Sequence, residues 1–458
     1  MTTSQTPMVP SVAAAGPGLK KTLTTPLLFL FILGDVLGAG VYVLVGQVAG
    51  EVGGAVWVPL VVALCLALLT AGSYAELATK YPRAGGASHY TTLAYGPFVG
   101  FVIGFCMLAA GIVSVGALAR AFGGDYLTEF VTAPIALVAV LFLIALALLN
   151  ARGISESMRA NSVATLIEVG GLILIIGLGA WVMLRGDGDP SRLTELGVHD
   201  KGPAGAVLSG SVLAYYSFVG FETSVNVAEE TRNPRRSYPR ALFGALVVAG
   251  VIYALVGIVA SAVVPTDRLV ASSGPLLEVV EIAGGVPEWL FSAIALVAVA
   301  NGALLTGIMS SRLTYGMARD GLLPAFLARV LPGRRTPWTA IATTTGLSLL
   351  LALTGDVATL ASTLVLLLLV VFLAVNVAVL VLRRNPGEHE REHFRVPTVL
   401  PILGAASCVL LSTRVEADVW ARGLPLIGAG IVLGLLSAVR RSRQRPGENE
   451  SHTSGPVV

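Results

Sequence analysis

Charge is scarce in this chain of 458 residues. Only 12% of its residues are charged and 55% are hydrophobic, whereas a soluble domain carries about 25% charged residues. A water-soluble protein of this length needs a wide polar surface, and so few charges cannot cover it. The composition therefore excludes a soluble enzyme and a disordered chain, and it predicts that the solvent of this protein is a lipid bilayer.

Cysteine is also rare, and positive charge is not concentrated in a way that suits a nucleic acid. The three cysteines, Cys65, Cys106 and Cys408, lie in apolar stretches and are odd in number, so no disulfide framework is expected. The net charge is +3, and no basic stripe with interleaved aromatic residues is present, which excludes nucleic-acid binding. No phosphate-binding loop or dinucleotide fingerprint is present, so we expect no cofactor and no ATP-driven step.

Long apolar segments are what the chain has in abundance. A helix needs about 20 apolar residues to cross the hydrocarbon core of a bilayer. Breaks at charged and Pro/Gly-rich clusters predict about twelve such segments. They lie at about 25–50, 55–79, 95–120, 132–150, 160–184, 204–230, 240–264, 286–312, 336–354, 357–382, 398–413 and 423–439. Runs of this length do not suit barrel strands, so we expect an all-α polytopic membrane protein.

The distribution of arginine and lysine predicts the orientation. With the N-terminal tail inside and alternating spans, most of the 30 lysine and arginine residues fall in inside loops, as the positive-inside rule requires. We therefore expect both termini in the cytoplasm. Residues 1–22 and 441–458 are polar and predict disordered tails around a transmembrane domain at 23–440. Arginine outnumbers lysine, which favours a bacterial source and hence the bacterial cytoplasmic membrane.

Two of the predicted spans are interrupted near the middle. The first contains Gly38-Ala39-Gly40, and the sixth contains Ser217 and Gly220 at the equivalent depth. A helix break inside a membrane is tolerated only where it lines a cavity or is buried in protein. Free N–H groups at one half-helix end attract a carboxylate and free carbonyl groups at another attract a cation, so the pair would recognise a zwitterion. Close helix packing is the alternative explanation for these glycines.

Four stretches of the chain resemble amino acid permeases of the APC superfamily. They are GDVLGAGVYVLVG at 34–46, SYAELATKYPRAGGASHY at 73–90, YYSFVGFETSVNVAEETRNPRRSYPRA at 215–241 and SRLTYGMARDGLLP at 311–324. The resemblance favours the branch that is similar to cationic amino acid transporters. It implies a transporter and not an enzyme, working as a secondary active carrier of amino acids by alternating access around spans 1, 3, 6, 8 and 10.

The resemblance also implies a LeuT-like fold. In this fold two five-span units, here about 25–184 and 204–382, form an inverted repeat in which helices 1 and 6 are discontinuous. The last two spans, at about 398–440, would then be peripheral. Spans one and six are the first members of the two units, which is the arrangement that an inverted repeat requires.

Substrate-binding residues follow from the same resemblance. It implies that backbone amides at Ala39 and Gly40, next to Gly38, hold the carboxylate of the substrate. Carbonyl groups of the sixth span would hold the amine, namely those of Tyr216, Ser217 and Val219. Phe221 matches an aromatic residue that closes over the substrate from outside, although ordinary packing would also place an aromatic side chain there.

Three carboxylates lie within predicted spans, where a charge is costly and marks a functional site by default. They are Asp35, Glu168 and Glu222. Many relatives have a lysine where Glu168 stands. Because burial makes a carboxyl group hold its proton more tightly, proton coupling is the leading hypothesis. Sodium coupling is the second, with Glu168 completing a cation site beside the first span, Ser310 and Ser311. A purely structural Glu168 is the remaining alternative.

Other interpretations stay open. Asp35 could receive the cationic end of an amine or a polyamine, or it could be a helix-end charge that reaches water. Exchange of amino acids is a further alternative to uptake. The segment from His389 to His393 spells the zinc-protease pattern HExxH, but it lies in a predicted loop without an apolar helix or a third ligand, so we expect no metal site. The substrate side chain and the oligomeric state are not readable from the sequence.

Overall fold

The computed structural model describes residues 23–38, 40–82, 85–152, 157–196, 202–332, 334, 336–384 and 393–443. Within these ranges the regular structure is helical, apart from an isolated bridge between Leu23 and Thr231. The first part of the chain holds α1 (Thr25–Leu37), α2 (Gly40–Val52), α3 (Trp57–Lys80), α4 (Gly86–Tyr95), α5 (Pro97–Phe122), α6 (Asp125–Thr128), α7 (Ile135–Arg152), α8 (Ser157–Arg185) and the 3₁₀ helix η1 (Pro190–Thr194). The second part holds α9 (Gly202–Tyr216), η2 (Phe221–Glu230), α10 (Pro234–Val263), α11 (Thr266–Ala271), α12 (Pro275–Ala283), α13 (Glu288–Arg319), η3 (Ala325–Ala328), α14 (Trp338–Thr354), α15 (Val357–Arg384), α16 (Val399–Ser412) and α17 (Ala417–Arg443).

Most of the long helices can span a bilayer. In the described chain eight are long and apolar enough, and the bent pair α1 and α2 makes a ninth. This confirms an all-helical protein with many spans. The expected sixth, ninth and eleventh spans correspond to α9 with η2, α14 and α16. With 15, 17 and 14 residues, α9, α14 and α16 fall short of the about 20 residues that a span needs. The count of twelve therefore stays a prediction.

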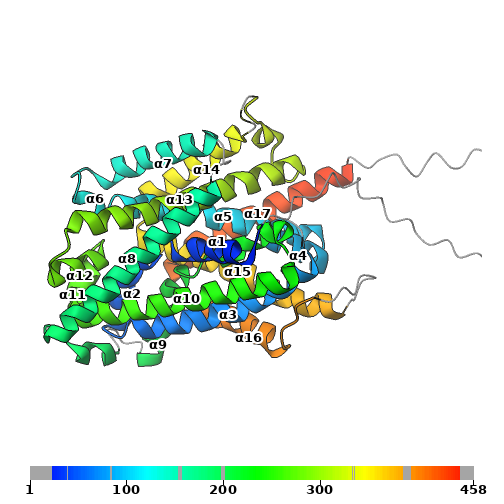
Figure 1. Cartoon of the computed structure of the whole chain (residues 1–458). Helices are drawn as coiled ribbons and strands as arrows, with labels where there is room; N and C mark the ends of the chain where they lie inside the picture. Colours follow the sequence, from blue (N-terminus) through cyan, green and yellow to red (C-terminus); the bar gives the residue numbers. More distant parts are fainter. Residues whose placement is uncertain are drawn as a thin grey trace, which may run out of the picture.

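The long helices run side by side in one bundle (Figure 1). The short helices α11 and α12 lie at its left end in this view, and α4 and the end of α17 lie at its right end. Inside the bundle, α5 packs against α13, α14 and α15, and α1 packs against α8 and α10. Helices α16 and α17 pack on α15 from outside, α16 also contacting α3 and α17 also contacting α5.

The first span is broken where the sequence predicts it. Helix α1 begins with Pro26 in its first turn, where a missing N–H costs nothing. It ends at Leu37, Gly38 follows as its C-cap, and α2 starts at Gly40 with its axis bent by 41° from that of α1. Ala39 lies outside the described residues. The interruption therefore falls at the glycine pair that the sequence marks.

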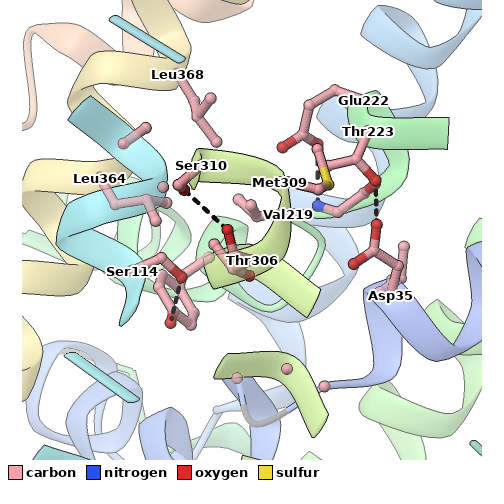
Figure 2. Close-up of a pocket in the computed structure, with 18 of the residues that line it drawn as sticks. Asp35, Ser114, Val219, Glu222, Thr223, Thr306, Met309, Ser310, Leu364 and Leu368 are labelled. Atoms are coloured by element: carbon pink, nitrogen blue, oxygen red, sulfur yellow. Dashed lines mark hydrogen bonds between the residues drawn. The ribbon is translucent and has the colours of Figure 1, made fainter. Parts of the chain in front are cut away.

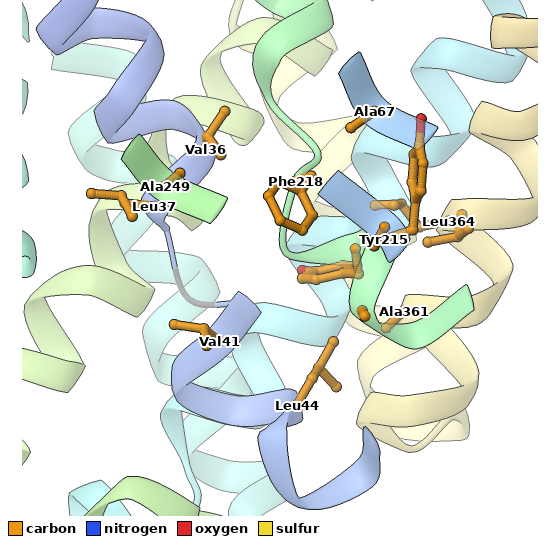
Figure 3. Packing of buried hydrophobic residues seen from close by; sticks show 14 of the residues in the cluster. Val36, Leu37, Val41, Leu44, Ala67, Tyr215, Phe218, Ala249, Ala361 and Leu364 are labelled. Carbon is orange, nitrogen blue, oxygen red and sulfur yellow. The ribbon is translucent and has the colours of Figure 1, made fainter. Parts of the chain in front are cut away.

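The sixth segment is broken in a different way. Helix α9 ends at Tyr216, and the N–H groups of Ser217 and Phe218 donate to carbonyl oxygens three residues back, at 3.1 and 3.0 Å. The chain then turns at Gly220, whose φ of +126° is one that residues with a side chain rarely adopt. It continues as the 3₁₀ helix η2. Large apolar side chains, Leu44, Tyr215 and Phe218 among them, pack around this turn (Figure 3).

A buried ion pair fixes the segment that leads into α16. The guanidinium of Arg383 on α15 donates to the Glu76 carboxylate on α3 through Nε at 2.7 Å, and through Nη2 to the carbonyl oxygen of Val396 at 2.7 Å. The N–H of Val396 donates back to Glu76 at 3.0 Å. The side chain of Glu76 is only 2% exposed. These contacts join α3, α15 and the approach to α16.

Candidate functional site

The two breaks meet at one cavity in the middle of the bundle. It encloses roughly 810 Å³ of empty space, part of which is open to solvent. Five groups of residues line it, from the predicted spans 1, 3, 6, 8 and 10 (Figure 2). They are Asp35, Val36, Gly38 and Gly40; Met107, Ala110, Gly111, Ser114 and Leu118; Tyr216, Ser217, Val219, Gly220, Glu222 and Thr223; Gly302, Thr306, Met309, Ser310 and Leu313; and Leu364 and Leu368.

Glycines let the two breaks touch each other. A Cβ atom added to Gly40 would lie 2.6 Å from the Cα atom of Ser217, which is too close for any side chain. Likewise a Cβ atom on Gly220 would lie 2.6 Å from the carbonyl oxygen of Asp35. Each glycine therefore admits the backbone of the other break, and both breaks expose backbone groups to the same cavity.

Polar backbone groups at the breaks have different partners. The hydroxyl of Tyr253 on α10 donates to the carbonyl oxygen of Val36 at 2.6 Å, which satisfies one carbonyl at the end of α1. The carbonyl oxygen of Tyr216 accepts the N–H of Val219 at 3.1 Å. Among the described residues, no hydrogen-bond donor reaches the carbonyl oxygens of Ser217 and Val219. These two oxygens can therefore accept hydrogen bonds from a ligand.

Two carboxyl groups face the cavity from the two breaks. The hydroxyl of Thr223 donates to the Asp35 carboxylate, and the N–H of Gly220 donates to Glu222 at 2.9 Å (Figure 2). Glu222 is only 3% exposed. No lysine, arginine or histidine is among the described residues that line the cavity. The side chains of this cavity therefore favour a cationic group, and a carboxylate would depend on backbone N–H groups.

Glu168 lies outside this cavity, in a buried polar cluster between α8 and α13. The amide nitrogen of Asn301 on α13 donates to Glu168 Oε1 at 3.1 Å and to the side-chain oxygen of Asn161 at 3.2 Å. Glu168 is fully buried, and its Oε2 atom has no hydrogen-bond partner in the described chain. The backbone of Glu168 is tied to α2, because the hydroxyl of Tyr42 donates to its carbonyl oxygen at 2.8 Å.

The expected grouping of Glu168 with two serines is absent from the structure. Ser310 lines the central cavity and donates to the carbonyl oxygen of Thr306 at 2.8 Å. Ser311 is buried beside α7, where it accepts the Asn150 amide at 3.2 Å and donates to the carbonyl oxygen of Ile308 at 2.9 Å. Successive residues of a helix point about 100° apart, and here Ser310 faces the cavity while Ser311 faces α7.

Phe221 also lies away from the cavity. Its ring is fully buried and packs on Phe372 at 5.4 Å and edge-on against Tyr74 at 5.7 Å between ring centroids. The aromatic residue that lines the cavity is Tyr216, whose hydroxyl is 3.4 Å from Ser114 Oγ. The sequence predicted only a backbone role for Tyr216. It did not predict that the ring lines the cavity, because the winding changes from α to 3₁₀ within a few residues.

The sequence did not predict most of the individual residues that α5, α13 and α15 contribute to the wall of the cavity. Gly111 of α5 and Thr306 and Met309 of α13 line the cavity, and so does Leu364 of α15. No group of acidic, histidine or cysteine side chains suited to a metal ion is found in the described residues. Most of the HExxH segment, residues 389–392, lies outside them.

Comparison with known proteins decides the family. The family described as amino acid permease matches residues 23–416, which is most of the chain. The chain belongs to the amino acid permease family. It is therefore a multi-pass membrane transporter and not an enzyme, as its composition and its motifs predict.

Relatives of this permease carry different names at similar identity. The vacuolar cationic amino acid transporter 4 of Arabidopsis thaliana is 31% identical, over 93% of this chain and 77% of its own. The branched-chain amino acid permease BcaP of Bacillus subtilis is 27% identical, over 93% and 94%. The methylthioribose transporter of the same bacterium is 26% identical, over 94% and 96%. Overall identity alone therefore does not select a substrate within the family.

Proposed function

We propose that this permease is a secondary active transporter that moves amino acids across the membrane by alternating access. The observation that carries the proposal is the meeting of two helix breaks at one cavity. The N–H groups at the start of α2, at Gly40 and at Ala39 outside the described residues, would hold the substrate carboxylate. The carbonyl oxygens of Ser217 and Val219, which have no donor in the described chain, would hold the ammonium group with Tyr216 beside them.

In this proposal the fold is LeuT-like. The breaks at 37–40 and 217–220 fall at the start of the two proposed units, about 25–184 and 204–382, which supports an inverted repeat. The proposal keeps twelve spans, with α9 and η2 together forming the sixth, and both termini in the cytoplasm of a bacterial cell. Alternating access would move helices around the site while the two breaks keep their contact.

The proposed coupling ion is a proton carried by Glu168. Its carboxyl group is fully buried, and it has one amide donor and one oxygen atom without a partner in the described chain. A buried carboxyl group in this setting is least costly when it is protonated. Sodium is the weaker candidate, because the hydroxyls of Ser310 and Ser311 point elsewhere and bring no oxygen ligand to Glu168.

A carrier of amines or polyamines is the second candidate function. Asp35 and Glu222 both face the cavity, and its described lining has no basic side chain. Such a wall suits a substrate with a cationic end, which would be a cationic amino acid or an amine. A relative named as a cationic amino acid transporter fits the first of these two substrates.

Counterflow in proteoliposomes tests the function without assuming a coupling ion. Liposomes loaded with an unlabelled amino acid should take up the same radiolabelled amino acid, whereas liposomes loaded with its decarboxylated amine should not. Counterflow with amines alone would replace the amino acid function by the amine function. No counterflow with any member of a panel of amino acids and amines would contradict both.

A further inference from the structure

A second cavity lies at one end of the bundle. It encloses roughly 750 Å³ of empty space, part of which is open to solvent. Its wall comes from the end of α2, from α9, from the first turns of α15 and from the connection between α16 and α17. In contrast to the central cavity, it has a basic residue in its lining, Arg414. The other polar residues of the lining are Gln47, Glu51, Ser209, Thr359, Ser362 and Glu416.

The two cavities are stacked along the same three helices. On α9 Leu213 lines the second cavity and Tyr216 the central one, three residues apart and so ~4.5 Å along the axis. On α15 Ser362 lines the second cavity and Leu364 the central one. On α2 the corresponding residues are Gln47 and Gly40, ~10 Å apart. The two spaces are therefore separated by less than one helical turn along α9 and α15 and by about two turns along α2.

A thin apolar layer fills that separation. Leu44 of α2 is 1% exposed, and Leu364 of α15 is 1% exposed. Figure 3 shows Leu44 of α2 and Leu364 of α15, which belong to the same buried cluster as Tyr215 and Ala361. No polar side chain of α2 lies between Gly40 and Gln47 except Tyr42, whose hydroxyl is engaged with α8.

We propose that the second cavity is a transit site for the zwitterionic substrate, in which Arg414 holds the carboxylate. This inference rests on the proposed function. A guanidinium binds a carboxylate through two parallel hydrogen bonds, and carboxylate and hydroxyl oxygens of the lining suit an ammonium group. The transit site thus binds the substrate through side chains, whereas the central cavity binds it through backbone groups. Substrate waits in this site until the apolar layer opens.

Directional kinetics test the transit site. Uptake into intact cells presents substrate to one face of the protein, and efflux from preloaded cells presents it to the other. Arg414→Gln should raise KM about tenfold or more for transport that starts at the face of the second cavity, and should lower the maximal rate by a similar factor in the opposite direction, so that kcat/KM falls equally in both directions. Equilibrium binding to the purified protein should stay within twofold, and Arg414→Lys should recover part of the loss. Arg422→Gln is the matched control, because Arg422 lies on α17 near Gly355 and does not line the cavity.

The outcomes separate the transit site from the proposed function. If the wild-type protein transports amino acids but Arg414→Gln keeps the wild-type KM in both directions, the transit site is wrong and the transport function stands. A rise in KM for Arg422→Gln as large as the rise for Arg414→Gln would also overturn the transit site. So would a loss of equilibrium binding in Arg414→Gln as large as the rise in its KM. If Arg414→Gln does not fold, Arg414→Lys with an unchanged KM in both directions would contradict it. A wild-type protein that transports no amino acid would overturn the proposed function itself.

Discussion

At the scale of single residues, the contact between the two breaks depends on missing side chains. Gly40 admits the backbone of Ser217, and Gly220 admits the carbonyl group of Asp35. Neither glycine lies in a helix interior, where glycine costs roughly 1 kcal/mol, because Gly40 is the first residue of α2 and Gly220 precedes η2. At these positions glycine permits a close approach that no residue with a side chain allows. The same two contacts hold the free backbone groups of both breaks against one cavity.

Substitution of Gly40 tests this contact. Gly40→Ala would place a Cβ atom 2.6 Å from Ser217 Cα, and over-packing of this kind destabilises a protein by about 1–3 kcal/mol. We expect a lower melting temperature in detergent and at least tenfold slower counterflow. Gly346→Ala on α14 is the control, since a Cβ atom there meets no other atom within 4 Å. Equal stability and equal transport of both variants would contradict the account.

Substitution of Glu168 tests proton coupling. Glu168→Gln keeps a side-chain oxygen for the Asn301 amide but cannot release a proton. Counterflow should continue within a few-fold of the wild type, whereas accumulation driven by a pH gradient should disappear. Glu129→Gln, at an exposed position after α6, should change neither property. An unchanged response of Glu168→Gln to the pH gradient would remove Glu168 from the coupling mechanism.

At the scale of elements, the ion pair of Glu76 and Arg383 joins α3, α15 and the approach to α16. Removal of one partner leaves the other charge buried, which costs about 3–5 kcal/mol. Glu76→Ala should therefore lower the melting temperature strongly, and the double variant Glu76→Leu with Arg383→Met should recover much of the loss. Glu281→Ala, which breaks an exposed pair with Arg268, should cost less than about 1 kcal/mol. Similar losses for Glu76→Ala and Glu281→Ala would contradict a structural role of the buried pair.

The positions of most elements could be predicted from the sequence, but many side chains of the cavity could not. Runs of about 20 apolar residues mark a span whatever surrounds it, and Gly38 and Gly220 mark the breaks. The faces of α5, α13 and α15 carry no such signal, because lipid and protein interior are both apolar and select the same residue types. The side chain of Phe221 could not be placed from the sequence either. It follows a break at which the winding changes from α to 3₁₀, and this change alters the direction of the side chains that follow.

At the scale of the whole molecule, most charge lies outside the bundle interior, and the few acidic groups inside it have separate places. Asp35 and Glu222 face the central cavity, and Glu168 lies in a polar cluster next to it. The proposed division of labour is that the cavity binds substrate while the cluster binds a proton. Substrate bound in the cavity and a proton bound in the cluster can then favour the same conformational change, which is what coupled transport requires.

Gradient-driven accumulation tests the central claim most directly. Purified protein in liposomes is given a radiolabelled amino acid at equal concentration on both sides and an imposed pH gradient, with a sodium gradient in parallel samples. The account predicts that the amino acid accumulates on the alkaline side several-fold above equilibrium and that a protonophore abolishes this accumulation. An amino acid that stays at equal concentration under both gradients would contradict secondary active transport by this permease.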